Sequence, residues 1–192
     1  DLCPYTVTVT NPDGRAGWLT DAFTVEEGLG VWTTGGPYGG YIEQILVNPQ
    51  VTTTIYAIGT QVGLFKSTDG GEWWDRAITA SVHVGAMALK PNAPQTLAWG
   101  DDKGLYESPD EGLTWRKLIT GQVSAVAYAP ASPEKLYALH DGSVRVSSDG
   151  GQSWEPSGSG LPHLDGRALA VHPLTTTIAY VGAYDGAICK TI

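Results

Sequence analysis

Short runs in which apolar and polar residues alternate recur along the chain, and each leads into a proline. A period of two is the pattern of a strand with one buried face. Seven residues after each proline comes a second apolar run, and a third run follows a turn. The first runs are Tyr41–Val47, Val84–Leu89, Val123–Tyr128 and Arg167–Val171. The prolines that follow them are Pro49, Pro91, Pro130 and Pro173. The second runs are centred on Tyr56, Ala98, Tyr137 and Tyr180. The pattern predicts strands throughout and no helix.

An eight-residue phrase with the skeleton Ser-x-Asp-x-Gly-x-(Thr/Ser)-Trp follows the third run three times. Aspartate before glycine between two apolar runs predicts a tight turn, because the carboxylate can accept backbone N–H groups and glycine adopts positive φ readily. The tryptophan then opens a fourth strand. We name these segments the Asp turns, and their repeated residues are Ser67, Asp69, Gly71 and Trp74, then Ser108, Asp110, Gly112 and Trp115, then Ser147, Asp149, Gly151 and Trp154.

The Asp turns recur at a nearly constant interval, with their aspartates 41 and then 39 residues apart. A repeat of about forty residues that holds four short antiparallel strands is the sequence form of a β-propeller blade. The sequence therefore predicts an all-β propeller. Its visible blades are expected at about 38–80, 81–119, 120–160 and an incomplete 161–192.

These phrases resemble the Asp-box, or bacterial neuraminidase repeat, found in β-propellers. The resemblance covers residues 29–192, and the family includes sialidases, some endoglucanases, sortilin-like receptors and bacterial surface proteins. No motif points to one functional subfamily. Because each aspartate belongs to its own blade and its own turn, we interpret Asp69, Asp110 and Asp149 as structural residues and not as a converging calcium or catalytic cluster.

The first 28 residues resemble the C-terminal end of an IPT/TIG module, which is immunoglobulin-like. Thr and Val alternate over Tyr5–Thr10, Asn11–Gly14 is typical of a turn, and Asp21–Val25 predicts a returning strand. A complete sandwich of this kind needs about 100 residues, and an isolated hairpin is marginal in water. Either the rest of the module is missing, or the hairpin packs on the propeller or on a neighbouring chain.

Two interpretations of the last blade stay open. Thr191 follows Pro173 by the interval that leads to the serine of each Asp turn, so the fourth Asp turn is missing and a longer polypeptide is expected. Alternatively, Val31–Thr34 resembles the tryptophan-bearing fourth strand. It would then complete the last blade of a closed four-bladed ring, the smallest ring that propellers form.

Composition favours a secreted or cell-surface β-protein that binds neither nucleic acid nor a membrane. The 25 glycines and 12 prolines suit many tight turns, charged residues make up 16%, and the net charge is −9. Nucleic acid and anionic lipid both require clustered basic residues, and the 11 Lys and Arg are scattered. No apolar run reaches the 18 residues of a membrane span. We expect no cofactor.

Neither the cysteines nor the histidines have the spacing of a metal motif. Cys189 takes the place of Phe65 and Tyr106 in its repeat, which predicts a buried apolar thiol. A disulfide between Cys3 and Cys189 is the alternative, and it would tie the hairpin to the last blade. Acidic turns at Asp101, Asp141 and Asp185 contain oxygen ligands, but Asp-Gly turns need no cation.

Function is predicted to be non-enzymatic contact or assembly outside the cell, with a protein, a glycan or further copies of the chain as partner. The alternative is a glycoside hydrolase of the sialidase or endoglucanase kind. The resemblance to sialidases implies an arginine triad, and the arginines here do not form one. Glu43 and Asp165 lie on or near first strands, which line a propeller channel, and could serve a two-carboxylate mechanism. The candidate contact surface is formed by the loops before the first strands, with Tyr38, Tyr41, His83, Gln122 and Asp165.

Overall fold

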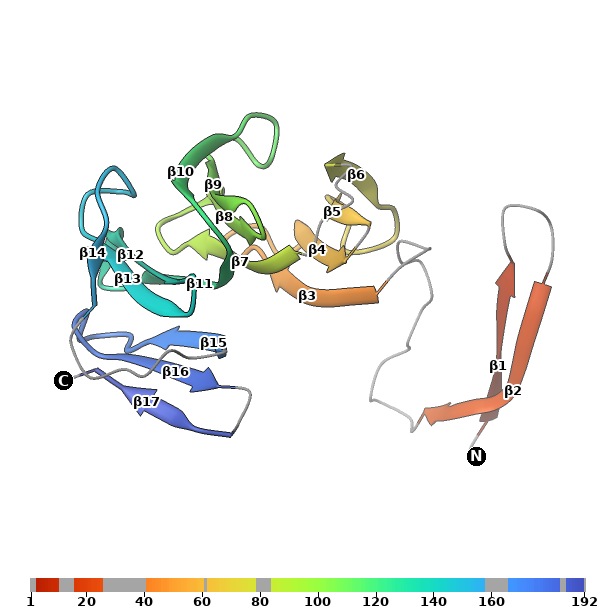
Figure 1. Ribbon diagram of the computed structural model, residues 1–192. Helices are drawn as coiled ribbons and strands as arrows, with labels where there is room; N and C mark the ends of the chain where they lie inside the picture. Colours follow the sequence, from red (N-terminus) through yellow and green to blue (C-terminus); the bar gives the residue numbers. More distant parts are fainter. Residues whose placement is uncertain are drawn as a thin grey trace. The chain divides into compact units, whose positions relative to one another are not determined.

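The computed structural model describes residues 3–10, 16–25, 41–60, 62–78, 84–157, 166–183 and 186–191. The chain forms two compact units, Asp1–Gly36 and Pro37–Ile192. The first unit contains an antiparallel hairpin of β1 (Cys3–Thr10) and β2 (Ala16–Val25) (Figure 1). The predicted turn at Asn11–Gly14 lies outside the described residues, as does Val31–Thr34.

The second unit is built from four antiparallel sheets, each made of strands that are consecutive in the sequence. Three sheets have four strands, the fourth has three in the described part of the chain, and the described residues contain no helix. This confirms the predicted all-β fold of blade-like sheets. Blade 1 is β3 (Tyr41–Val47), β4 (Ile55–Thr60), β5 (Gly63–Ser67) and β6 (Asp75–Ile78); blade 2 is β7 (Val84–Lys90), β8 (Ala93–Asp101), β9 (Gly104–Ser108) and β10 (Arg116–Thr120). Blade 3 is β11 (Val123–Ala129), β12 (Ser132–His140), β13 (Ser143–Ser147) and β14 (Glu155–Pro156); blade 4 is β15 (Gly166–Val171), β16 (Ala179–Ala183) and β17 (Ile188–Lys190).

Every first strand carries a register shift at the same place. The shifts fall between Ile42 and Gln44 in β3 and at the corresponding residues of β7, β11 and β15. One residue is therefore unpaired in each first strand, which is the definition of a β-bulge. The bulged residues are Glu43, Gly85, Ser124 and Arg167.

The core lies between successive blades, because alternate residues of each strand point to opposite faces of its sheet. Tyr56, Ile58 and Leu64 of blade 1 pack with Met87 and Trp99 of blade 2. Analogous clusters join blades 2 and 3, and blades 3 and 4. Successive first strands contact one another (Figure 1). The blades thus stack through one repeated interface.

Polar groups also join the blades. The Tyr128 hydroxyl donates to Glu107 Oε1 (3.0 Å) across the junction of blades 2 and 3. Glu107 is itself buried and pairs with Arg116 (Nη2–Oε2 2.5 Å). Burial and the adjacent Glu107 carboxylate raise the pKa of the Tyr128 phenol. This hydroxyl therefore stays protonated and continues to donate.

Candidate functional site

The three Asp turns share a common set of internal hydrogen bonds, and one further bond, from a hydroxyl side chain, occurs in blades 2 and 3. In blade 2, Ser108 Oγ donates to Asp110 Oδ1 (2.8 Å) and accepts from the Gly112 N–H (2.8 Å). Asp110 also accepts from the backbone and hydroxyl of Thr114, and Trp115 Nε1 donates to the Gly112 carbonyl (3.0 Å). The glycine has φ of +95°, a conformation that favours glycine.

The turns of blades 1 and 3 repeat this geometry. Ser67 and Ser147 donate to Asp69 and Asp149 (2.8 and 2.7 Å), and the ring nitrogens of Trp74 and Trp154 donate to Gly71 and Gly151 (3.0 and 3.1 Å). In blade 1, Trp73 stands where the other copies have a hydroxyl residue. Asp69 therefore accepts the backbone N–H of Trp73 (3.0 Å) but no side-chain hydroxyl from that position. Each carboxylate is used by its own turn.

These hydrogen bonds lower the pKa of all three aspartates. For Asp149 the pKa falls from 3.8 to about 2, first because the Ser153 hydroxyl donates to it, then because of the Ser153 N–H and the Ser147 hydroxyl. A carboxyl with a depressed folded-state pKa stabilises the fold above its unfolded pKa, and this contribution is lost as the pH falls through the folded-state value. The relevant window for Asp149 is therefore pH 3.8 down to about 2.

We expect Asp149→Asn to be destabilising at neutral pH and progressively less so in acid. Asparagine offers one acceptor oxygen in place of two and carries no charge. Urea unfolding of the wild-type chain and the variant should give stability curves that are separated above about pH 4 and converge toward about pH 2. A difference that is constant over this range would show that the Asp149 charge does not act through the turn.

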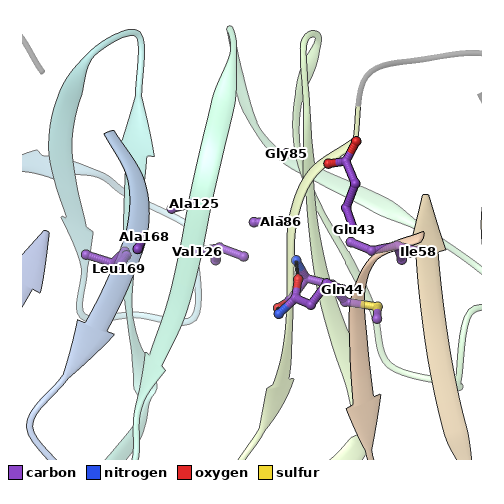
Figure 2. Close-up of a pocket in the computed structure, with 10 residues that line it drawn as sticks. Glu43, Gln44, Ile58, Gly85, Ala86, Ala125, Val126, Ala168 and Leu169 are labelled. Atoms are coloured by element: carbon purple, nitrogen blue, oxygen red, sulfur yellow. Dashed lines mark hydrogen bonds between the residues drawn. The ribbon is translucent and has the colours of Figure 1, made fainter. Parts of the chain in front are cut away.

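A cavity of about 460 Å³ lies where the first strands of the four blades meet. Figure 2 shows its lining, with Glu43 and Gln44 on one side and Ala168 and Leu169 on the other. Most lining side chains are small or aliphatic. The complete lining is Glu43, Gln44, Ile58, Gly85, Ala86, Met87, Ala125, Val126, Ala168 and Leu169.

The polar residues of the lining come from β3. The Gln44 amide makes two hydrogen bonds to the backbone of Met87, donating to its carbonyl (2.9 Å) and accepting from its N–H (2.8 Å). Glu43 is exposed and accepts a hydrogen bond from Thr60 Oγ1. Among the lining residues, Glu43 supplies the one carboxylate. The cavity therefore has mostly small or aliphatic side chains, an exposed lining that is more polar than apolar, and one charged side chain at the β3 side.

The wall of the cavity is held together differently at each junction of first strands. Gln44 joins β3 to β7, as described above. Between β7 and β11 the backbones approach so closely that a Cβ on Gly85 would lie 2.2 Å from the Val123 carbonyl oxygen. Between β11 and β15, Ser124 Oγ donates to the Gly166 carbonyl (3.0 Å). Gly85 and Ser124 are two of the bulged residues, so the bulges position the wall.

The sequence reasoning did not single out Gln44, Gly85 or Ser124. A signal was present, since all four bulged residues lie six positions before the proline of their repeat. The alternation of apolar and polar residues could not identify the bulged residues, because a bulge interrupts that alternation by one residue only.

The structure describes part of the predicted contact surface. Tyr41 and Gln122 are both exposed, at or next to the start of β3 and β11, and the Gln122 N–H donates to Asp141 Oδ1 (2.9 Å). Tyr38, His83 and Asp165 lie outside the described residues. Glu43 lines the cavity, whereas its predicted companion Asp165 cannot be placed.

Cysteine and metal chemistry add no site among the described residues. Cys189 is half-buried and packs against the cluster between blades 3 and 4. The side chain of Cys3 is outside the described residues, so the Cys3–Cys189 disulfide stays a prediction. The described residues contain no group of three potential metal ligands. They also contain no helix long and apolar enough to cross a membrane.

Comparison with solved structures identifies the sheets as blades of a β-propeller. The chain is similar to an ancestral GH74 enzyme, with a TM-score of 0.64 and 18% identity over 79% of this chain and 23% of that one. It is similar to the GH74 xyloglucanase from Xanthomonas campestris, with a TM-score of 0.63 and 20% identity over 78% and 29%. YCF48 bound to D1 peptide matches with a TM-score of 0.59 and 12% identity over 79% and 51%.

These likenesses show the fold alone. The chain spans about a quarter of the length of the two GH74 structures and about half of the YCF48 structure. No family model and no curated protein matches the sequence. Enzymes and a peptide-bound protein share this fold, so the function must be argued from the cavity.

Proposed function

We propose that the chain is a non-enzymatic propeller module that binds an extended polypeptide segment outside the cell. In this proposal the Asp turns are Asp-box repeats with a structural role, and the N-terminal hairpin is the end of an IPT/TIG module. The cavity formed by the four first strands is the binding site. It is the observation on which the proposal depends most.

The lining of the cavity supports a polypeptide ligand. Ala86, Ala125 and Val126 are almost fully buried, so the exposed lining is more polar than apolar and can pair with the N–H and C=O groups of an extended backbone. Tyr41 adds an exposed aromatic ring at the start of β3, the strand that supplies Glu43 and Gln44. A ligand segment with a basic group would match the Glu43 carboxylate. The peptide on YCF48 is consistent with such a use of the fold.

The described lining of the cavity, which does not include Asp165, supports binding over catalysis. Glycoside hydrolysis by the common mechanisms requires two carboxyl groups about 5–10 Å apart. Glu43 is the one carboxylate among the lining residues, and it already accepts the Thr60 hydroxyl. The cavity so described is better suited to holding a ligand than to cleaving one.

To test this proposal, peptides that bind the wild-type chain are selected from a displayed library of random peptides. Their affinity is then measured for a variant whose cavity is blocked by a large side chain. Ala168 is exposed and lines the cavity, so Ala168→Trp fills space at little cost to the core. Selected peptides should bind the wild-type chain and lose about tenfold or more in affinity on the blocked variant. Leu113→Trp, on an exposed turn of blade 2, is the matched control and should leave binding unchanged. Equal binding to the blocked variant would reject the cavity as the site.

Glycoside hydrolysis is the second candidate, favoured by the two GH74 structures and by the position of Glu43. We expect no turnover of xyloglucan, β-glucans or sialosides by the purified chain. Turnover that disappears in Glu43→Gln would replace the binding proposal with an enzymatic one, because this change removes the charge and keeps the shape. Glycan binding without turnover would keep the module non-enzymatic and change the class of its ligand.

A further inference from the structure

The edges of first strands form part of the cavity lining (Figure 2). β7 and β11 each stand last in the strand order of their sheet, so one edge of each strand has no neighbouring strand in that sheet. The side chains of Ala86 and Val126 pack in the cluster between blades 2 and 3, and that of Met87 packs between blades 1 and 2. These residues therefore present mainly backbone to the cavity. An unpaired strand edge offers N–H and C=O groups to a partner.

Gln44 shows how a carboxamide binds such an edge. Its Nε2 donates to the Met87 carbonyl (2.9 Å), and its Oε1 accepts from the Met87 N–H (2.8 Å). Because both bonds go to one residue, the amide must present its N–H and its C=O on the same side. A primary carboxamide does so, whereas a single trans peptide group or N-acetyl group holds its N–H and C=O on opposite sides.

The corresponding edge of β11 lacks this cap. Val126 corresponds to Met87, because both lie four positions before the proline of their repeat and pair with their second strands in the same register. By this register the Val126 N–H and C=O point away from β12, as those of Met87 point away from β8. The residue that corresponds to Gln44 is Ala86, whose methyl group forms no hydrogen bond. β11 contacts the first strands on both of its sides, β7 and β15, so this edge is an internal feature of the array.

We propose that the polypeptide bound in the cavity carries an asparagine or glutamine whose carboxamide pairs with the Val126 backbone, as Gln44 pairs with Met87. The inference rests on the proposed function and names the group that the cavity recognises. The Val126 N–H donates to the carboxamide oxygen, and the Val126 carbonyl accepts the carboxamide N–H. A strand added to β11 would need a run of such pairs. The lining includes only Ala125 and Val126 of β11, which suits a single pair.

Hydrogen exchange in the free chain tests the open edge without a ligand. Gln44 holds the Met87 N–H, so we expect the Val126 N–H to exchange about tenfold faster or more. Ala86→Gln places a carboxamide at the position that corresponds to Gln44, and it should slow the exchange of Val126 to that of Met87. Equal protection of the two amides in the wild-type chain would overturn the inference.

Peptides selected on the wild-type chain test the ligand. Those that lose affinity on Ala168→Trp should share an asparagine or glutamine. Replacing that asparagine by leucine, or that glutamine by methionine, keeps the approximate size and the neutrality of the side chain. It should weaken binding about tenfold or more, because two hydrogen bonds are lost. Ala86→Gln should weaken the original peptides to a similar extent, whereas Leu113→Gln, on an exposed turn, should leave their affinity unchanged.

The two levels of the proposal fail in different ways. Peptides that depend on the cavity but tolerate loss of their carboxamide would overturn this inference, indicate pairing through the main chain, and leave the proposed function standing. Peptides that bind Ala168→Trp as well as the wild-type chain would reject the proposed function and this inference with it. If Ala86→Gln does not fold, the peptide replacements measured on the wild-type chain decide the question.

Discussion

Leu105→Ala is expected to lower the free energy of unfolding by about 2–5 kcal/mol. Leu105 lies on β9, is fully buried, and belongs to the cluster that joins blades 2 and 3 through Val126 and Tyr128. Truncation removes buried apolar surface and leaves a cavity between two sheets that their backbone hydrogen bonds hold in place. Urea unfolding followed by tryptophan fluorescence would measure the change.

The matched control is Leu113→Ala, because Leu113 is a leucine of the same blade that is 84% exposed. It should change the unfolding free energy by about 0.5 kcal/mol or less. Similar effects at the two positions would mean that the blades are not packed through Leu105. A loss confined to Leu105→Ala would establish that the interface between blades supplies the stability.

Gly85→Ala is expected to destabilise the fold by about 1–3 kcal/mol or more, although it adds a single methyl group. The new Cβ would lie 2.2 Å from the Val123 carbonyl oxygen and 2.9 Å from the Ser124 Cα. Both are backbone atoms of β11, so the clash can be relieved only by separating two first strands. Because Gly85 also lines the cavity, the same change should weaken binding of any peptide selected on the wild-type chain.

Gly182→Ala is the control for this prediction. Gly182 lies on a second strand and lines up with Ala168, whose Cβ would be 3.5 Å from the added methyl group, an ordinary contact. Thermal unfolding should show a clear decrease in Tm for Gly85→Ala and little change for Gly182→Ala. A stable Gly85→Ala variant would contradict the close approach of β7 and β11.

Much of the fold could be predicted because its signals are local. Alternation over Val123–Tyr128 indicates a strand wherever that segment lies, and the sequence around Asp110 contains both the acceptor and the glycine that its turn requires. The interval between the Asp turns then determined that these strands form repeated sheets. The partners of each turn aspartate lie within a few residues of it, so its hydrogen bonds could be predicted from the local sequence. The contacts of Gln44 reach the next blade and could not.

The tertiary structure decided what depends on neighbours distant in the chain. Gln44 bonds to Met87, 43 residues later, and alanines occupy its equivalent positions in the other blades, so nothing in its repeat indicates this bridge. The requirement for glycine at position 85 comes from the backbone of the next blade and not from its own conformation. Likewise, Ile45 and Met87 occupy equivalent positions in their repeats but differ in exposure, because Met87 packs on Tyr56, Ile58 and Leu64 of blade 1. The sequence by itself determined the strands, the turns and the repeat, whose interactions are short-range. The cavity arises where separate repeats meet, and only the packing of those repeats could define it.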